Sequence, residues 1–283
     1  MDNLLGIYEK ALPKDISWEE RLRISKDIGF DFIEVSIDES YDRISRLYWS
    51  KSQRLELIKS IMHNDIPIMS MCFSAHRRFP FGSIVKENRE KAFELMEKAI
   101  LFARDLGIRV IQMAGYDVYY EQSTAETRQR FIEGLKKSVA LAEKYQVMLA
   151  METMDTAFIN SITRYLEIHK DVNSPWFTVY PDLGNLSAWG NNVNEELKKG
   201  FSKIVAVHVK DTLPVTKNFP GQFRDVPFGK GCVDFISAFK TLKSLNYRGP
   251  FLIEMWSEKS QDPISEVVAA KEWVLERLSE AGF

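Results

Sequence analysis

Short runs of apolar, β-favouring residues recur along the chain, and each is followed by a segment with apolar residues at helical spacing. The pattern predicts eight strands, at residues 4–9, 31–37, 66–73, 109–115, 147–153, 177–183, 204–211 and 250–256. It predicts helices at 18–28, 51–64, 86–106, 124–145, 162–171, 194–199, 234–245 and 263–278. Two helix starts have capping-box spacing, with Ser17 three residues before Glu20 and Ser123 three residues before Glu126.

Strands that are almost continuously apolar and alternate with helices indicate a parallel sheet covered by helices. Eight such units in 283 residues match an α/β fold of the (β/α)₈ TIM-barrel type, which typically needs about 250 residues. We therefore expect a single barrel domain over residues 1–283. An open doubly wound sheet is the alternative, but the segment GIYEKALP lacks the glycine-rich turn that such a sheet uses for a pyrophosphate.

Composition narrows the classes of partner. The net charge is −2 and both signs are mixed along the chain, which argues against nucleic acid or a membrane surface and favours a small-molecule substrate. No apolar run approaches the ~20 residues of a membrane span, and the N-terminal residues do not resemble a secretion signal, so we expect a cytoplasmic protein. The two cysteines, Cys72 and Cys232, predict neither a disulfide framework nor a zinc–thiolate site.

Each of the last four predicted strands carries one polar residue near its carboxyl end, where a TIM barrel has its active site. These residues are Glu152, Asp182, His208 and Glu254. Strand periodicity places them on the inward face, and neighbouring strands lie ~4.8 Å apart, so they could surround one point. Three carboxylates and an imidazole in a dry barrel mouth would repel one another without a divalent cation. Mn²⁺, Zn²⁺, Co²⁺ or Mg²⁺ would suit such ligands. Taken singly, each residue could instead form a buried ion pair or a cap.

Two other polar residues follow earlier strands. His76, beside Arg77 and Arg78 in the loop after the third strand, could meet an anion at the active-site mouth or simply lie in a solvated loop. Glu34, late in the second strand, could contact substrate, support a ligand or form a buried salt bridge.

The motifs METMD, PDLGN, VHVKDT, VPFGKGCVDF and FLIEMW resemble the xylose-isomerase-like barrel superfamily, which includes endonuclease IV, ketose 3-epimerases and inosose dehydratases. With GIYEKALP near the N-terminus, the chain looks most similar to the L-ribulose/L-xylulose 5-phosphate 3-epimerase branch, and the resemblance spans nearly the whole sequence. It implies an isomerase of pentose-phosphate metabolism with one divalent ion, Zn or Mn, bound by Glu152, Asp182, His208 and Glu254. It also implies that Glu152 and Glu254 transfer protons at C3 through an enediolate.

The chain departs from free-ketose epimerases in ways that concern the substrate. Those enzymes have His three residues after the metal-binding Asp and Arg soon after the metal-binding His, whereas this chain has Asn185 and no Arg before Arg224. Arg224, Lys230 and the amides near Gly229 and Gly231 could receive a phosphate, or the glycines could merely order the loop. Lys10, just after the first strand, could also reach the site.

Three alternatives to this function stay open. An endonuclease IV-like enzyme uses a trinuclear zinc cluster with several histidines and a basic groove, whereas this chain has four histidines and a balanced charge. A free-ketose or hexulose-phosphate epimerase, an aldose–ketose isomerase or a dehydratase could use the same ligands. A non-catalytic sugar-phosphate-binding barrel would have no reason to keep opposed glutamates on a metal. An oligomer is the expected assembly, with a homodimer as one possible form.

Overall fold

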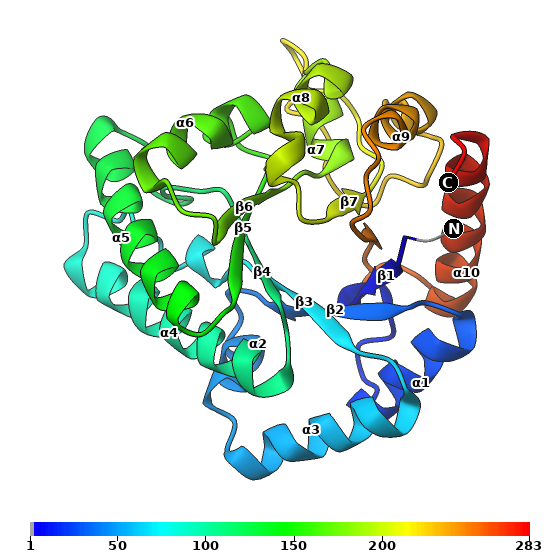
Figure 1. The fold of residues 1–283 in the computed structure, drawn as a ribbon, viewed down its shortest axis with the longest axis horizontal. Coiled ribbons are helices and arrows are strands. Elements are labelled where there is room, and N and C mark those ends of the chain that lie inside the picture. Colours follow the sequence, from blue (N-terminus) through cyan, green and yellow to red (C-terminus); the bar gives the residue numbers. More distant parts are fainter. Residues whose placement is uncertain (1–2) are drawn as a thin grey trace.

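The computed structural model, which describes residues 3–283, contains eight parallel strands around a common centre with helices outside them (Figure 1). The strands are β1 (Leu5–Tyr8), β2 (Phe32–Ile37), β3 (Ile68–Phe73), β4 (Val110–Met113), β5 (Met148–Glu152), β6 (Phe177–Tyr180), β7 (Val207–Val209) and β8 (Phe251–Ile253). They hydrogen-bond in the order β6-β5-β4-β3-β2-β1-β8-β7. The gap between β6 and β7 is closed by two isolated parallel bridges, Val179 with Ile204 and Asp182 with His208. The expected TIM barrel is confirmed.

The main helices are α1 (Trp18–Ile28), α3 (Lys51–Asn64), α4 (Lys86–Leu106), α5 (Ala125–Lys144), α6 (Ile162–Val172), α8 (Val193–Gly200), α9 (Phe235–Ser244) and α10 (Pro263–Glu280). Two further helices, α2 (Tyr41–Ser45) and α7 (Leu183–Ala188), follow strands at the barrel mouth, and short 3₁₀ turns lie at Glu9–Ala11, Arg46–Tyr48, Ala75–Arg77 and Phe201–Lys203. Among the described residues, no helix is both long and apolar enough to cross a membrane.

One of the two predicted helix caps is wrong by a residue. Ser17 and Glu20 form the expected capping box of α1. At the start of α5, the cap is Thr124, which exchanges hydrogen bonds with Thr127. Ser123 does not cap because its hydroxyl donates to the Asp117 carboxylate at 2.7 Å.

Alternation along the strands decides which side chains face the barrel interior. On β5, Leu149 and Met151 join the large core between strands and helices, whereas Ala150 packs with Tyr180 and Ala206 in a separate interior cluster. Glu152, two residues after Ala150, therefore points to the interior at the carboxyl end of its strand. The inward-facing side chains at the carboxyl ends of β5 to β8 form the candidate site.

Candidate active site

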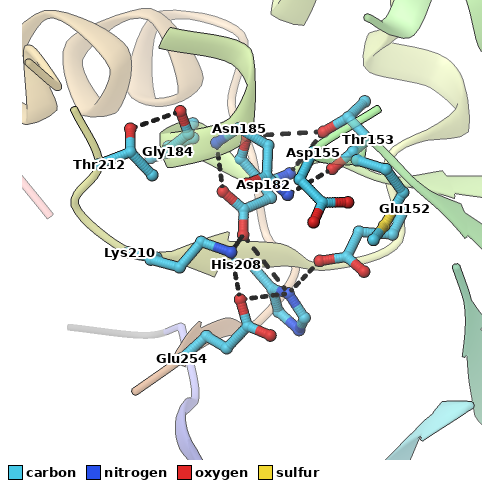
Figure 2. A network of polar contacts seen from close by, with 12 residues as sticks. Glu152, Thr153, Asp155, Asp182, Gly184, Asn185, His208, Lys210, Thr212 and Glu254 are labelled. Carbon is cyan, nitrogen blue, oxygen red and sulfur yellow. Dashed lines mark hydrogen bonds and ion pairs between the residues drawn. The ribbon is translucent and has the colours of Figure 1, made fainter. Parts of the chain in front are cut away.

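Four buried side chains meet at the carboxyl ends of β5 to β8 (Figure 2). Glu152 is the last residue of β5, Asp182 lies two residues beyond β6, His208 is the middle residue of β7, and Glu254 follows β8. One ligand atom from each lies within 4.8 Å of the others, and every residue is at most 6% exposed. The structure thus brings together the four residues that the strand pattern predicts to meet.

Asp182 has two tasks because it is also the N-cap of α7. Its Oδ1 accepts the amide hydrogen of Asn185 at 2.7 Å, which starts the helix and fixes the side chain. Its backbone amide donates to Thr153 Oγ1 at 2.9 Å, which ties it to the end of β5. Oδ2 is left facing the other ligand candidates without a hydrogen bond.

His208 presents Nδ1 to the cluster and Nε2 to a carboxylate behind it. Nδ1 lies 3.0 Å from Glu152 Oε1, 3.7 Å from Glu254 Oε2 and 3.8 Å from Asp182 Oδ2. Nε2 lies 3.0 Å from Glu34 Oε1, whose other oxygen accepts a hydrogen bond from Ser70 at 2.6 Å. A proton held on Nε2 by Glu34 leaves the Nδ1 lone pair free for a cation. Glu34 lies against His208 and is not among the residues that line the cavity, which fits the ligand-supporting and buried salt-bridge alternatives and not contact with substrate.

Lys210 also belongs to the cluster, although it is not among the residues predicted to meet there. Its Nζ donates to Glu254 Oε2 at 2.7 Å and forms an ion pair with Asp182 Oδ2 at 2.9 Å (Figure 2). The signal that could have found it is its spacing. Lys210 stands two residues after His208, so both side chains leave the chain on the same side, with Lys210 nearer the mouth.

Burial and neighbouring charges move the pKa values of the carboxyl groups in opposite directions. Burial raises the pKa of Glu152 and of Asp182, despite the opposing effect of His208 and Lys210. Burial acts in the same sense on Glu254, but Lys210 and His208 outweigh it and lower the pKa of that carboxyl. Ionising all of these groups together therefore calls for additional positive charge.

The donor set fits one divalent metal ion. It offers carboxylate oxygens from Glu152, Asp182 and Glu254 and one imidazole nitrogen from His208, all facing one another. Asp182 Oδ2 is a buried oxygen that accepts no hydrogen bond, and its one ion-pair partner at short range is the Lys210 ammonium at 2.9 Å, so this oxygen already faces a cation. Such oxygen-rich sets with one His suit divalent ions of the Mn²⁺, Zn²⁺, Co²⁺ and Mg²⁺ group.

A cavity of about 270 Å³ opens above the cluster and gives a substrate access to Glu152 and Glu254. Tyr8 and Trp256 pack edge-to-face and form an apolar part of its wall. Its cationic lining residues are Lys10, Arg77, Lys210 and Arg224. A small polar molecule with a negatively charged end is the kind of ligand that this lining suits.

The cavity's cations differ in how far they are already neutralised. Lys10 is paired with Asp38 at 2.5 Å, and Arg77 lies 3.7 Å from Glu39. Arg224 stacks on Trp256, 4.7 Å from its ring centroid, and has no ion pair within the described residues. Arg224 is therefore the cation at the mouth with the most charge to offer a ligand.

Asn185 lies at the cavity, whereas Lys230 does not. The side-chain Nδ2 of Asn185 donates to the carbonyl oxygen of Thr153 at 2.8 Å, and its buried Oδ1 has no hydrogen-bond partner. Lys230 is exposed and is not among the residues that line the cavity.

The glycine-rich segment orders its own loop. The Asp211 carboxylate accepts hydrogen bonds from the amides of Gly229 and Gly231, both at 2.9 Å. A Cβ on Gly231 would lie 2.1 Å from Asp211 Oδ1, so only glycine allows this approach. This arrangement matches the loop-ordering alternative rather than the phosphate-binding one, because the buried carboxylate already accepts the hydrogen bonds of both amides.

His76 does not reach the cavity. It is 3% exposed, packs between Phe73 and Phe81, and lies with Nε2 3.0 Å from the carbonyl of Ala92 in α4. The anion-binding role considered for His76 finds no support in this position. The solvated loop considered as its alternative is not observed either, because apolar rings enclose the imidazole.

This burial predicts a pH effect on stability. Burial lowers the pKa of His76 to about 4, below the ~6.5 of an unfolded chain. Between pH ~6.5 and 4 the unfolded chain binds a proton at His76 that the folded protein does not. The free energy of unfolding is therefore unaffected by His76 above pH ~6.5 and falls as the pH decreases toward 4, by roughly 3 kcal/mol in total. His76→Gln keeps a donor for Ala92 but cannot titrate, so its free energy of unfolding in urea should fall less over this range. The exposed His63→Gln is the control, and parallel curves for wild type and His76→Gln would contradict the prediction.

Comparison with known proteins agrees with the fold. Residues 22–277 match the model of the xylose isomerase-like TIM barrel family. The L-ribulose-5-phosphate 3-epimerase UlaE of Shigella sonnei is 55% identical over 278 residues, which is 98% of this chain and 96% of that protein. Escherichia coli K12 SgbU, provisionally named as the same enzyme, is 60% identical over 279 residues, 99% of this chain and 98% of its own.

Solved structures share the fold at low sequence identity. A structure of L-ribulose 3-epimerase has a TM-score of 0.78 and 19% identity, covering 99% of this chain and 95% of that one. D-psicose 3-epimerase of Clostridium cellulolyticum H10, solved with D-tagatose, has a TM-score of 0.79 and 17% identity. The match covers 97% of this chain and 99% of that one. The chain therefore belongs to the xylose isomerase-like TIM barrel family, in the branch of the proteins named L-ribulose-5-phosphate 3-epimerase, and is an enzyme of the isomerase class.

Proposed function

We propose that this enzyme is a metal-dependent sugar-phosphate 3-epimerase that interconverts L-ribulose 5-phosphate and L-xylulose 5-phosphate. The names of relatives that are 55–60% identical over nearly the whole chain support the substrate. The observation that carries the chemistry is the pair of buried glutamates, Glu152 and Glu254, which come from the two ends of the four-strand arc β5 to β8.

Epimerisation at C3 removes a proton from one face of the carbon and returns one to the other face, through an enediolate. Glu152 and Glu254 are the two groups that would exchange this proton with the substrate, one on each side, and they swap roles when the reaction reverses. A divalent ion, when bound by Glu152, Asp182, His208 and Glu254, supplies Lewis-acid stabilisation of the negative charge that develops on the substrate oxygens. His208, fixed by Glu34, and Asp182, fixed by α7, hold the arrangement rigid during proton transfer.

The substrate's phosphate would bind at the mouth, with Arg224 as its main partner. Arg224 lines the cavity, lies on a long loop after β7 and makes no ion pair with a described carboxylate. Lys10 and Arg77 line the same cavity and could add charge from the opposite loops, although each already has an acidic neighbour. Asn185 Oδ1 is an acceptor that could meet a sugar hydroxyl near the cluster.

Comparing phosphorylated and free ketoses tests this proposal. The enzyme should prefer L-ribulose 5-phosphate to L-ribulose in kcat/KM, and Arg224→Ala should reduce kcat/KM for the phosphate ester by about 10- to 100-fold, as expected when a charge-assisted contact is lost. Activity on the free ketose should change little. Arg23→Ala, on the outer surface of α1, is the matched control. Equal activity of wild type on both sugars would remove the phosphate from the proposed function.

A further inference from the structure

The acidic cluster has more negative charge than one divalent ion can neutralise. Glu152, Asp182 and Glu254 are all buried, and three ionised carboxylates exceed the charge of a dication by one. Lys210 is a buried ammonium group, 6% exposed, in contact with oxygens of Glu254 and Asp182 at 2.7 and 2.9 Å. Its positive charge equals the deficit of these three carboxylates, while the Glu34 carboxylate lies outside this count and faces His208 Nε2.

Nearby cations cannot take over this task. Arg224 is exposed and stacks on Trp256, and within the described residues it forms no ion pair with Glu152, Asp182 or Glu254. Lys10 is held by Asp38 at the other side of the mouth. Trp256 also covers Lys210, with Nζ 5.4 Å from the ring centroid, so the ammonium remains beside the carboxylates.

We propose that Lys210 is the charge-balancing residue of the cluster: its fixed positive charge completes the neutralisation of the three carboxylates and weakens their binding of a divalent ion. This inference rests on the proposed function, since it takes the cluster to bind one such ion. The ammonium and the ion are attracted to the same oxygens of Asp182 and Glu254 and repel each other. A cluster with no net negative charge also does not repel the negative charge that forms on the substrate during proton transfer.

Lys210→Met tests the proposal because methionine has a similar length and no charge. Zn²⁺ affinity, measured by competition with a chromophoric chelator, should be about 10- to 100-fold tighter in this variant, the range typical of changes next to a ligand shell. The difference in Tm between samples with excess Zn²⁺ and with chelator should widen, since uncompensated buried carboxylates destabilise the protein without the ion. A variant that folds only when Zn²⁺ is supplied would be the extreme form of this result.

Two further variants separate charge from shape. Lys210→Arg keeps the charge and should bind Zn²⁺ with nearly the wild-type affinity. Lys259→Met removes an exposed lysine that pairs with Asp225 at 2.6 Å and, within the described residues, with none of the cluster carboxylates, and it should also leave the affinity unchanged. Unchanged or weaker Zn²⁺ binding by Lys210→Met, or tighter binding by Lys210→Arg as well, would overturn the proposal. If the wild type binds no divalent ion, the proposed function itself fails; if it binds one and only the Lys210→Met result differs, the function stands.

Discussion

Replacing Glu152 or Glu254 by glutamine is expected to slow epimerisation by about 10²- to 10⁴-fold, the usual contribution of one proton-transfer group. Glutamine keeps the length of the side chain and one carbonyl oxygen, but it does not accept a proton at neutral pH. Because the two glutamates approach from opposite ends of the β5 to β8 arc, neither can take the place of the other. Coupled assays of pentulose 5-phosphate interconversion would give the rates, and metal analysis of the same samples would show whether the ligand set survives.

The two variants should differ in the half-reaction that they retain. Each should still exchange the C3 proton of the epimer that faces its remaining glutamate, and the two variants should act on opposite epimers. Glu258→Gln, an exposed residue on the loop after β8, is the control and should leave both rates unchanged. Full epimerase activity in Glu152→Gln or Glu254→Gln, with metal bound, would assign the proton transfer to another residue.

Removing the divalent ion is expected to abolish most of the activity. Lewis-acid stabilisation is worth several kcal/mol of transition-state energy, which corresponds to a loss on the order of 10³-fold or more. Chelation should also lower the Tm, because the ion binds the folded protein and not the unfolded chain. Activity should return in proportion to added Zn²⁺ or Mn²⁺ and level off at one equivalent per chain, since the described residues contain a single cluster of this kind.

The matched control is the same chelator already saturated with the metal, which should leave the rate unchanged. Full activity in protein with far less than one ion per chain would contradict a metal-dependent mechanism. A plateau at three ions per chain would point instead to a trinuclear site like that of endonuclease IV.

The hydrophobic pattern predicts most of the fold because long elements repeat their period several times. The predicted limits of α1, α3 and α4 agree with the structure to the residue. The pattern misses α2 and α7, whose five and six residues are too few to show a helical period. It also extends the strands too far: residues 204–211 are predicted as one strand, but only Val207–Val209 form the ladder of β7, and of the rest only Ile204 forms a bridge, to Val179.

The candidate ligands could be predicted because they obey a rule of position, with one inward polar residue in or just beyond the carboxyl-terminal part of each of four successive strands. Hydrogen-bond and packing partners that are far apart in the sequence could not be predicted in this way. The sequence of the loop after β3 does not show that His76 points away from the cavity and packs between Phe73 and Phe81. The amides of the glycine-rich loop look free in sequence, whereas Asp211 accepts their hydrogen bonds across 18 and 20 residues of chain. The role of Glu34 behind His208 depends on a contact across 174 residues.

The most direct test of the central claim is the position of solvent deuterium in the product. When L-ribulose 5-phosphate is incubated with the enzyme in D₂O, two-base proton transfer through an enediolate predicts that L-xylulose 5-phosphate forms with deuterium at C3, seen in proton NMR as loss of the C3 signal. Deuterium at C1 or C4 without exchange at C3, release of a dehydrated carbonyl compound, or epimerisation with the original C3 proton fully retained would each contradict it.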